Sequence, residues 1–150
     1  MTSTPTEDWL PETSLAIEQV ERLVAASRAP QAVELDPQIL AYLVRHIVIL
    51  LCSEIQREVT KHLINRVGLA GDAHVVSLVR GTSGSIVRSA RPDDISDVMA
   101  KLSPELKSYF KRRLKEELDE QASTLLGNVV TQRNSIAHDT QPNVTFSEMR

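Results

Sequence analysis

Residues 36–68 read DPQILAYLVRHIVILLCSEIQREVTKHLINRVG. Asp36 followed by Pro37 is a helix start signal, because the aspartate oxygen can accept an unpaired backbone N–H and proline suits the first turn. Aliphatic residues then recur every three or four positions: Leu40, Leu43, Val44, Ile47, Leu51, Ile55, Val59 and Leu63. This spacing predicts one helix of about eight turns that ends at Gly68.

Helical patterns also dominate the sequence on both sides of this segment. The other predicted elements are a first helix ending near Arg28, short helices joined by loops across residues 69–94, a short helix from Pro92 to Leu102, and the longest segment, from Pro104 to Arg133. Apolar spacing or a start signal supports the other three helices, whereas residues 69–94 carry mixed signals. Thr145 and Glu148 resemble a capping box, which predicts a further helix in which the chain stops, so we expect a truncated C-terminal helix.

Composition favours a single domain of packed helices. The chain has 150 residues, 41% apolar and 25% charged, which is the length of one ordinary domain with a substantial core. Only 3% of the residues are aromatic, so the core must be aliphatic. The net charge of -3 excludes a protein coated in positive charge but permits a local basic groove.

The sequence predicts a cytoplasmic protein. Its start, MTSTPTEDW, is acidic and polar, and the longest apolar run, residues 47–52, is far too short to span a bilayer. Cys52 is the single cysteine and cannot form an internal disulfide, so its expected role is to fill the core. We therefore expect no membrane partner.

Residues 131–140, TQRNSIAHDT, contain the candidate chemistry: Arg133, Asn134 and His138. Arginine grips phosphate oxygens, and histidine titrates near neutral pH. RNA can be cut without metal if one group takes the ribose 2′-hydroxyl proton, another protonates the leaving 5′-oxygen, and a fixed cation stabilises the added charge. One motif supplies one histidine, whereas a two-fold dimer would bring two together.

Helix geometry leaves a plainer interpretation open. On an ideal helix Arg133 and His138 lie roughly 140° apart, while Asn134 and His138 differ by only about 40°. Cleavage therefore requires either that Arg133 reaches around on its long side chain or that the helix unwinds near Ala137. Alternatively, a cation and a histidine simply favour the negative end of a helix.

Other candidate sites are weaker. Glu58 and His62 share a helical spacing, but no third ligand accompanies them, so neither a metal nor a cofactor is expected. Gly81 and Gly84 lack the lysine of a phosphate loop and predict a flexible turn. The basic run in residues 107–115 is either a solvated face paired with the acidic residues after it or a strip that contacts nucleic acid.

The R-N-x-x-A-H pattern of residues 133–138, at the end of the last long helix, resembles the signature of HEPN domains, closest to their RiboL-PSP-like branch. The resemblance covers residues 35–149. It implies an all-α, up-and-down bundle with two long antiparallel helices and additional short helices. It also implies a dimeric, metal-independent endoribonuclease, often a toxin or antiviral effector, with Arg133 and His138 catalytic and Asn134 supporting them. The family frequently has glycine after the histidine, where this chain has Asp139.

Glu54 is a candidate supporting residue. On the predicted helix it falls about 20° from the direction of Ile47 and Leu43, so it should point to the core or to a partner. A buried carboxylate needs a bonding partner. The family often has an acidic residue on this helix facing the motif, which implies that Glu54 holds Arg133; a purely structural salt bridge is the alternative.

Two functions from different classes follow. The first is a dimeric ribonuclease whose partners are RNA, a second copy of the chain and an antitoxin. The second is a helical module that binds RNA, a nucleotide or an antitoxin without cutting. Both are compatible with one domain spanning residues 1–150.

Overall fold

The computed structural model describes residues 10–117 and 120–136, in which there are six helices and no strand. The helices are α1 (Pro11–Ser27), α2 (Pro37–Gly68), α3 (Ala73–Ile86), α4 (Pro92–Leu102), α5 (Pro104–Glu117) and α6 (Glu120–Ile136). The predicted all-α class is confirmed. The helix expected after Pro142 lies outside the described residues.

Local signals set several helix boundaries as predicted. The Asp36 carboxylate accepts the backbone N–H of Gln38 at 2.7 Å, and α2 then continues to Gly68. At the start of α5, Ser103 Oγ accepts the backbone N–H groups of Glu105 and Leu106 at 3.1 and 3.3 Å. These side chains replace the intrahelical acceptors that a first turn lacks, which is why the helices begin there.

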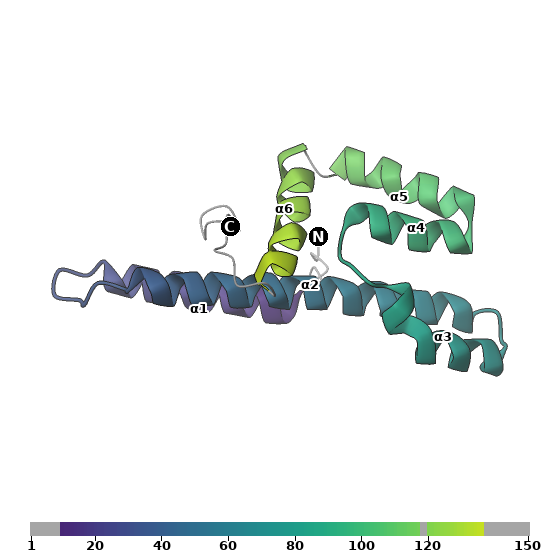
Figure 1. Cartoon of the computed structure of the whole chain (residues 1–150), viewed down its shortest axis with the longest axis horizontal. Coiled ribbons are helices and arrows are strands. Elements are labelled where there is room, and N and C mark those ends of the chain that lie inside the picture. Colours follow the sequence, from purple (N-terminus) through teal and green to yellow (C-terminus); the bar gives the residue numbers. More distant parts are fainter. Residues whose placement is uncertain (1–9, 118–119, 137–150) are drawn as a thin grey trace, which may run out of the picture.

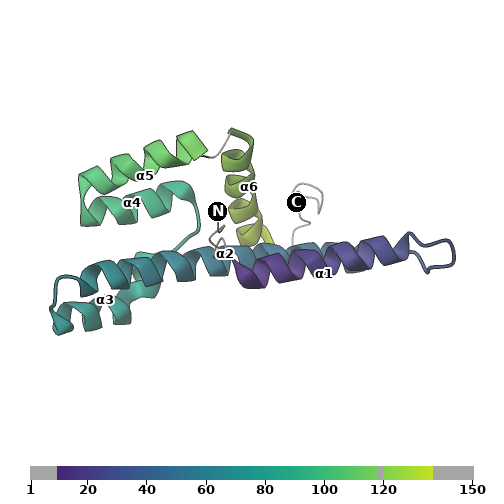
Figure 2. The same ribbon diagram turned by 180° about the vertical axis from the view of Figure 1, so that it is seen from behind.

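Helix α2 is the axis around which the other helices are arranged (Figure 1). α1 runs antiparallel beside the first half of α2, so α1 and α2 form an antiparallel pair of helices. α3 folds back on the far end of α2. α6 stands across the middle of α2, and α4 and α5 form a pair beside α6, as the view from behind also shows (Figure 2).

The longest predicted segment, from Pro104 to Arg133, is divided into α5 and α6, which point in different directions (Figures 1 and 2). α5 packs mainly on α4, whereas α6 packs mainly on α2. The apolar residues of this segment therefore pack against two different helices, α4 and α2, which lie in different directions. One straight helix could not contact both.

Gly81 and Gly84 lie inside α3, so the prediction of a flexible turn there is wrong. The Asp72 carboxylate starts α3 by accepting the backbone N–H groups of His74 and Val75 at 2.9 and 3.1 Å. Val79 and Ile86 of α3 pack against a buried cluster centred on Leu63, Val87 and Val98. Glycine costs about 1 kcal/mol in a helix interior, and packing of this kind offsets it.

By length and composition alone, α2 could cross a membrane, because an 18-residue window reaches a mean hydropathy of 1.6. The uninterrupted apolar run in residues 47–52 is too short to indicate this possibility, because polar residues interrupt the longer apolar window. The core helix of a soluble protein passes the same test, and α2 packs against α1, α3 and α6. Only 28% of the window is buried, so α2 presents apolar side chains outward.

Candidate functional site

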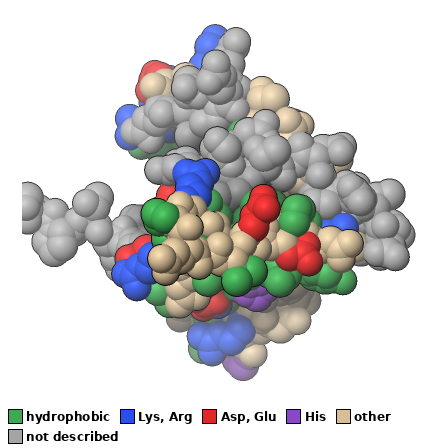
Figure 3. Space-filling view, turned by 90° about the vertical axis from the view of Figure 1, so that its left-hand side faces the viewer, with side chains coloured by type: hydrophobic (Ala, Val, Ile, Leu, Met, Phe, Trp, Pro, Cys, Tyr) green, Lys and Arg blue, Asp and Glu red, His purple; other side chains and the backbone are tan. Residues whose placement is uncertain are grey.

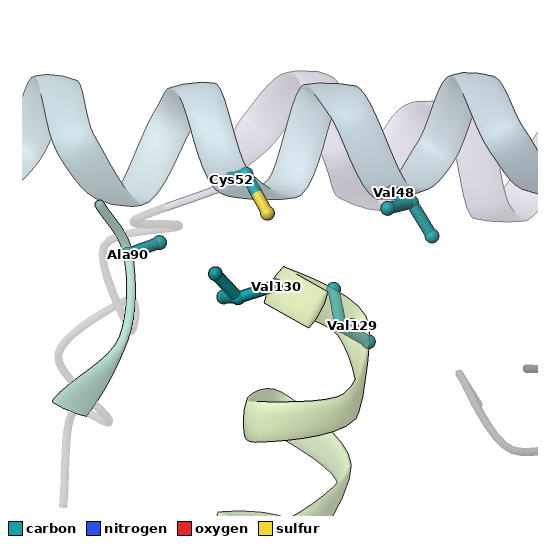
Figure 4. Packing of buried hydrophobic residues seen from close by; sticks show 5 residues of the cluster. All are labelled: Val48, Cys52, Ala90, Val129 and Val130. Atoms are coloured by element: carbon teal, nitrogen blue, oxygen red, sulfur yellow. The ribbon is translucent and has the colours of Figure 1, made fainter. Parts of the chain in front are cut away.

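The end of α6 is anchored in the main core of the molecule. Val129 and Val130 are buried against Val48 and Cys52 of α2 and against Ala90, which precedes α4 (Figure 4). Leu125, Leu126 and Ile136 pack around this cluster. The last two turns of α6 are therefore held on α2 by side chains that are almost fully excluded from water, which is a rigid support for the residues that follow.

Arg133 is in the last turn of this anchored helix, and its side chain is exposed. Asn134 follows it within α6, while His138 lies outside the described residues. The structure thus places two of the three predicted motif positions at one helix end. A cation there is also favoured by the negative end of the helix dipole, so the plainer interpretation of Arg133 stays open.

The charge of Arg133 reaches α2. Burial raises the pKa of the Cys52 thiol, and the nearby positive charge of Arg133 partly opposes that rise. Cys52 is 2% exposed and belongs to the core cluster, as expected for a residue that fills the core.

Glu54 is 1% exposed and bonds to α1. Its two carboxylate oxygens accept the backbone N–H groups of Glu12 and Thr13 at 2.9 and 2.8 Å. Arg57 adds a charged contact at 3.3 Å. Among the described residues, these three groups are the hydrogen-bond donors to Glu54, and Arg133 is not one of them. The contacts of Glu54 therefore agree with the alternative interpretation, a purely structural role.

The surroundings of Glu54 favour its ionised form. Burial alone raises its pKa, but the Thr13 hydroxyl dipole, the two backbone N–H groups and the charge of Arg57 outweigh burial and hold the pKa below its ordinary value. The Thr13 hydroxyl itself lies beside the carboxylate without hydrogen-bond geometry, so the backbone donors are the main bonded partners.

A second arginine lies against the motif helix. Arg91 Nη2 donates to Thr131 Oγ1 on α6 at 3.2 Å, and both side chains are exposed. The two residues are 40 positions apart in the chain, so no local spacing in the sequence signals this contact. The Ser89 Oγ accepts the backbone N–H of Arg91 at 3.1 Å, which helps to fix the segment that carries it.

The remaining candidates have ordinary surroundings. Glu58 pairs with Lys61 at 3.1 Å, and within residues 10–117 and 120–136 no group of three or more metal-binding side chains is assembled. In the basic run, Lys107 pairs with Asp97 at 2.8 Å and Arg112 with Glu116 at 3.9 Å. These contacts favour a solvated, paired face over a strip dedicated to nucleic acid.

Comparisons with protein-family models, curated proteins and solved structures find no match for this chain. The resemblance to HEPN domains therefore depends on the motif itself and on its place at the end of α6. The class that the fold defines is an all-α helical bundle.

Proposed function

We propose that the protein is a metal-independent endoribonuclease of the HEPN type, acting in the cytoplasm. The observation that carries the proposal is the position of Arg133 and Asn134, which begin the R-N-x-x-A-H motif, near the end of a helix held on α2 by a buried core. Catalysis requires groups held to a fraction of an ångström, and anchored helix ends provide such precision better than free loops.

The chemistry needs only the groups that the motif contains. One histidine removes the proton from a ribose 2′-hydroxyl, whose oxygen attacks the adjacent phosphorus. The bond from phosphorus to the 5′-oxygen breaks, and a second histidine protonates that leaving oxygen. Arg133 stabilises the negative charge that builds on the phosphate, and Asn134 orients the reacting groups. The products are a 2′,3′-cyclic phosphate and a 5′-hydroxyl.

Two histidines imply two chains, and the outward surface of α2 supports a homodimer. Ile39, Tyr42 and Ile49 are 52%, 70% and 42% exposed. Their positions, three and seven residues apart, fall on one face of the helix, and we call these three residues the α2 stripe. Hydrophobic side chains are visible on the exposed surface at this end of the molecule (Figure 3). A second copy of the chain would cover such a surface, which is costly to leave in water.

Val129 is excluded from that role, because it is 1% exposed and packs on α2 of its own chain. The sequence places Leu126 and Val129 just before the motif, which suggests an apolar surface for a partner there, but the burial of Val129 excludes it from such a surface. Antitoxin binding and a toxin or antiviral role follow from the family resemblance alone. We propose them as the biological role in which the ribonuclease acts.

The decisive experiment measures cleavage of a labelled single-stranded RNA in the presence of EDTA. We expect cleavage to persist and to leave 2′,3′-cyclic phosphate ends, which mass spectrometry of the fragments identifies. Activity that disappears with EDTA and returns with magnesium would overturn the mechanism. Binding of RNA without any cleavage would favour the non-catalytic module.

A further inference from the structure

Arg91 is a cation that the proposed chemistry does not use, although it contacts the motif helix. Its guanidinium donates to Thr131 at 3.2 Å. The preceding residue, Ala90, is 1% exposed and belongs to the core cluster beneath α6 (Figure 4). The backbone next to Arg91 is thus fixed relative to α6, so the position of the charge at the helix end is a property of the fold.

Arg91 contacts α6 at position 131, two residues before Arg133. Positions 131 and 134 are three apart and share a helix face, and the sequence spacing predicts the same face for position 138. Arg133 is two positions from Thr131, which corresponds to a rotation of about 200° on the helix. Arg91 therefore adds a second cation beside α6, on the side that carries positions 131 and 134.

The charge of Arg91 has no acidic partner among the described residues, where no carboxylate lies within salt-bridge distance of it. Arg88, three residues earlier, lines a surface cavity of about 450 Å³ together with Asp94 and Asp97, and its Nε donates to the Ser85 carbonyl oxygen at 2.8 Å. The neighbouring Asp93 is 3.8 Å from Lys111. Within the described part of the chain, the exposed guanidinium of Arg91 thus has no carboxylate partner, and Thr131 accepts from one of its five N–H donors.

We propose that Arg91 binds a backbone phosphate of single-stranded RNA next to the phosphate that is cut. This inference rests on the proposed function, and it assigns the RNA a path across the side of α6 that carries position 134. Arginine suits the role because its planar fork donates two parallel bonds to phosphate oxygens. The competing explanation is that Arg91 only ties the segment before α4 to α6 through Thr131.

The test is a fluorescence anisotropy titration with the full chain and an RNA oligonucleotide whose riboses are all 2′-O-methyl, so that no nucleophile is present. Affinity is measured between 50 and 200 mM salt for the wild type, Arg91→Ala, Arg91→Lys and Arg88→Ala. Each single-strand phosphate contact adds about 0.7 to the slope of log K against log salt. We therefore expect Arg91→Ala to lower the slope by about 0.7 and to weaken binding about fivefold at 100 mM salt.

The controls separate RNA binding from a structural tie. Arg91→Lys should restore the slope, Arg88→Ala should leave it unchanged, and Thr131→Val should keep it because the charge remains. If Arg91→Ala and Thr131→Val lower the melting temperature equally and neither changes the slope, the inference is overturned. Wild-type chain that does not bind the oligonucleotide also overturns it.

Cleavage of unmodified RNA distinguishes this inference from the proposed function. Cleaving wild type together with an unchanged slope in Arg91→Ala would refute the Arg91 site alone. An Arg91-dependent slope in a chain that never cleaves RNA would refute the nuclease and retain the phosphate site.

Discussion

Glu54 on α2 accepts the backbone N–H of Thr13 on α1 at 2.8 Å, across 41 positions of the chain. Leu10, which precedes α1, provides no side-chain cap, so the free N–H groups of Glu12 and Thr13 are satisfied by another helix. A carboxylate at this end also complements the positive pole of the α1 dipole. One side chain thereby fixes where α1 begins and how it docks on α2.

We expect Glu54→Gln to lower the free energy of unfolding by about 1–3 kcal/mol, because a buried charged acceptor is lost. Thermal unfolding followed by circular dichroism measures this. Glu58→Gln is the matched control, one turn along the same helix, where the side chain is 23% exposed and pairs with Lys61, and should change stability by less than about 0.5 kcal/mol. Equal losses in the two variants would contradict the capping role.

The same carboxylate predicts a pH dependence. Its folded pKa lies below the ordinary value of about 4.3, so its contribution to stability is present above that value and is lost as the pH falls through the lower folded pKa. The wild type should therefore lose more stability between pH 6 and pH 3 than Glu54→Gln does. Denaturant titrations at several pH values test this, and parallel curves would count against it.

Cys52 should report whether α6 is docked on α2. It is 2% exposed and burial raises the pKa of its thiol, so little reactive thiolate is accessible. We expect a disulfide reagent to react at least about 100-fold more slowly with the folded chain than in urea, because reaction needs local opening. Ser53→Cys combined with Cys52→Ala, at the adjacent exposed position, is the control and should react rapidly.

His138→Ala should separate chemistry from folding. Loss of a general acid or base typically lowers the rate by about 100-fold or more. We expect that decrease in RNA cleavage with little change in melting temperature. His74→Ala, at an exposed position near the start of α3, should retain full activity. Full activity in His138→Ala would move the assignment to the non-catalytic module.

The α2 stripe tests the dimer. Tyr42→Glu combined with Ile49→Glu places charge on two exposed apolar positions, so it should yield a folded monomer with much reduced cleavage. Light scattering after size-exclusion chromatography gives the mass. Leu78→Glu on α3, where the leucine is 66% exposed, is the control and should stay dimeric. A wild-type chain that is monomeric and still cleaves RNA at full rate would exclude the shared site.

Mixed dimers test whether the site is composite. A wild-type chain paired with an Arg133→Ala, His138→Ala chain has one complete motif, and tandem purification with two different tags isolates it. Independent sites would leave half of the wild-type activity. A shared site should leave far less, because removing one member of a cooperating pair costs nearly as much as removing both.

Local sequence determined where most helices begin and end. Asp36 caps α2 and Ser103 caps α5 through hydrogen bonds made within a few residues. Pro92 is the first residue of α4, where its fixed φ suits the first turn. Apolar spacing then predicted a buried face along α2, which the structure confirms at Ile47 and Leu63. These features were predictable because capping and periodicity act over one or two turns.

Tertiary structure decided how those helices meet. The division of the segment after Pro104 into α5 and α6, the capping of α1 by Glu54 and the contact of Arg91 with Thr131 join residues far apart in the chain. No local signal predicts such pairs, because the packing of apolar helix faces determines which distant residues come into contact. The sequence by itself thus determined most helix starts and the motif that begins in α6, whereas packing determined which charges surround that end of the helix.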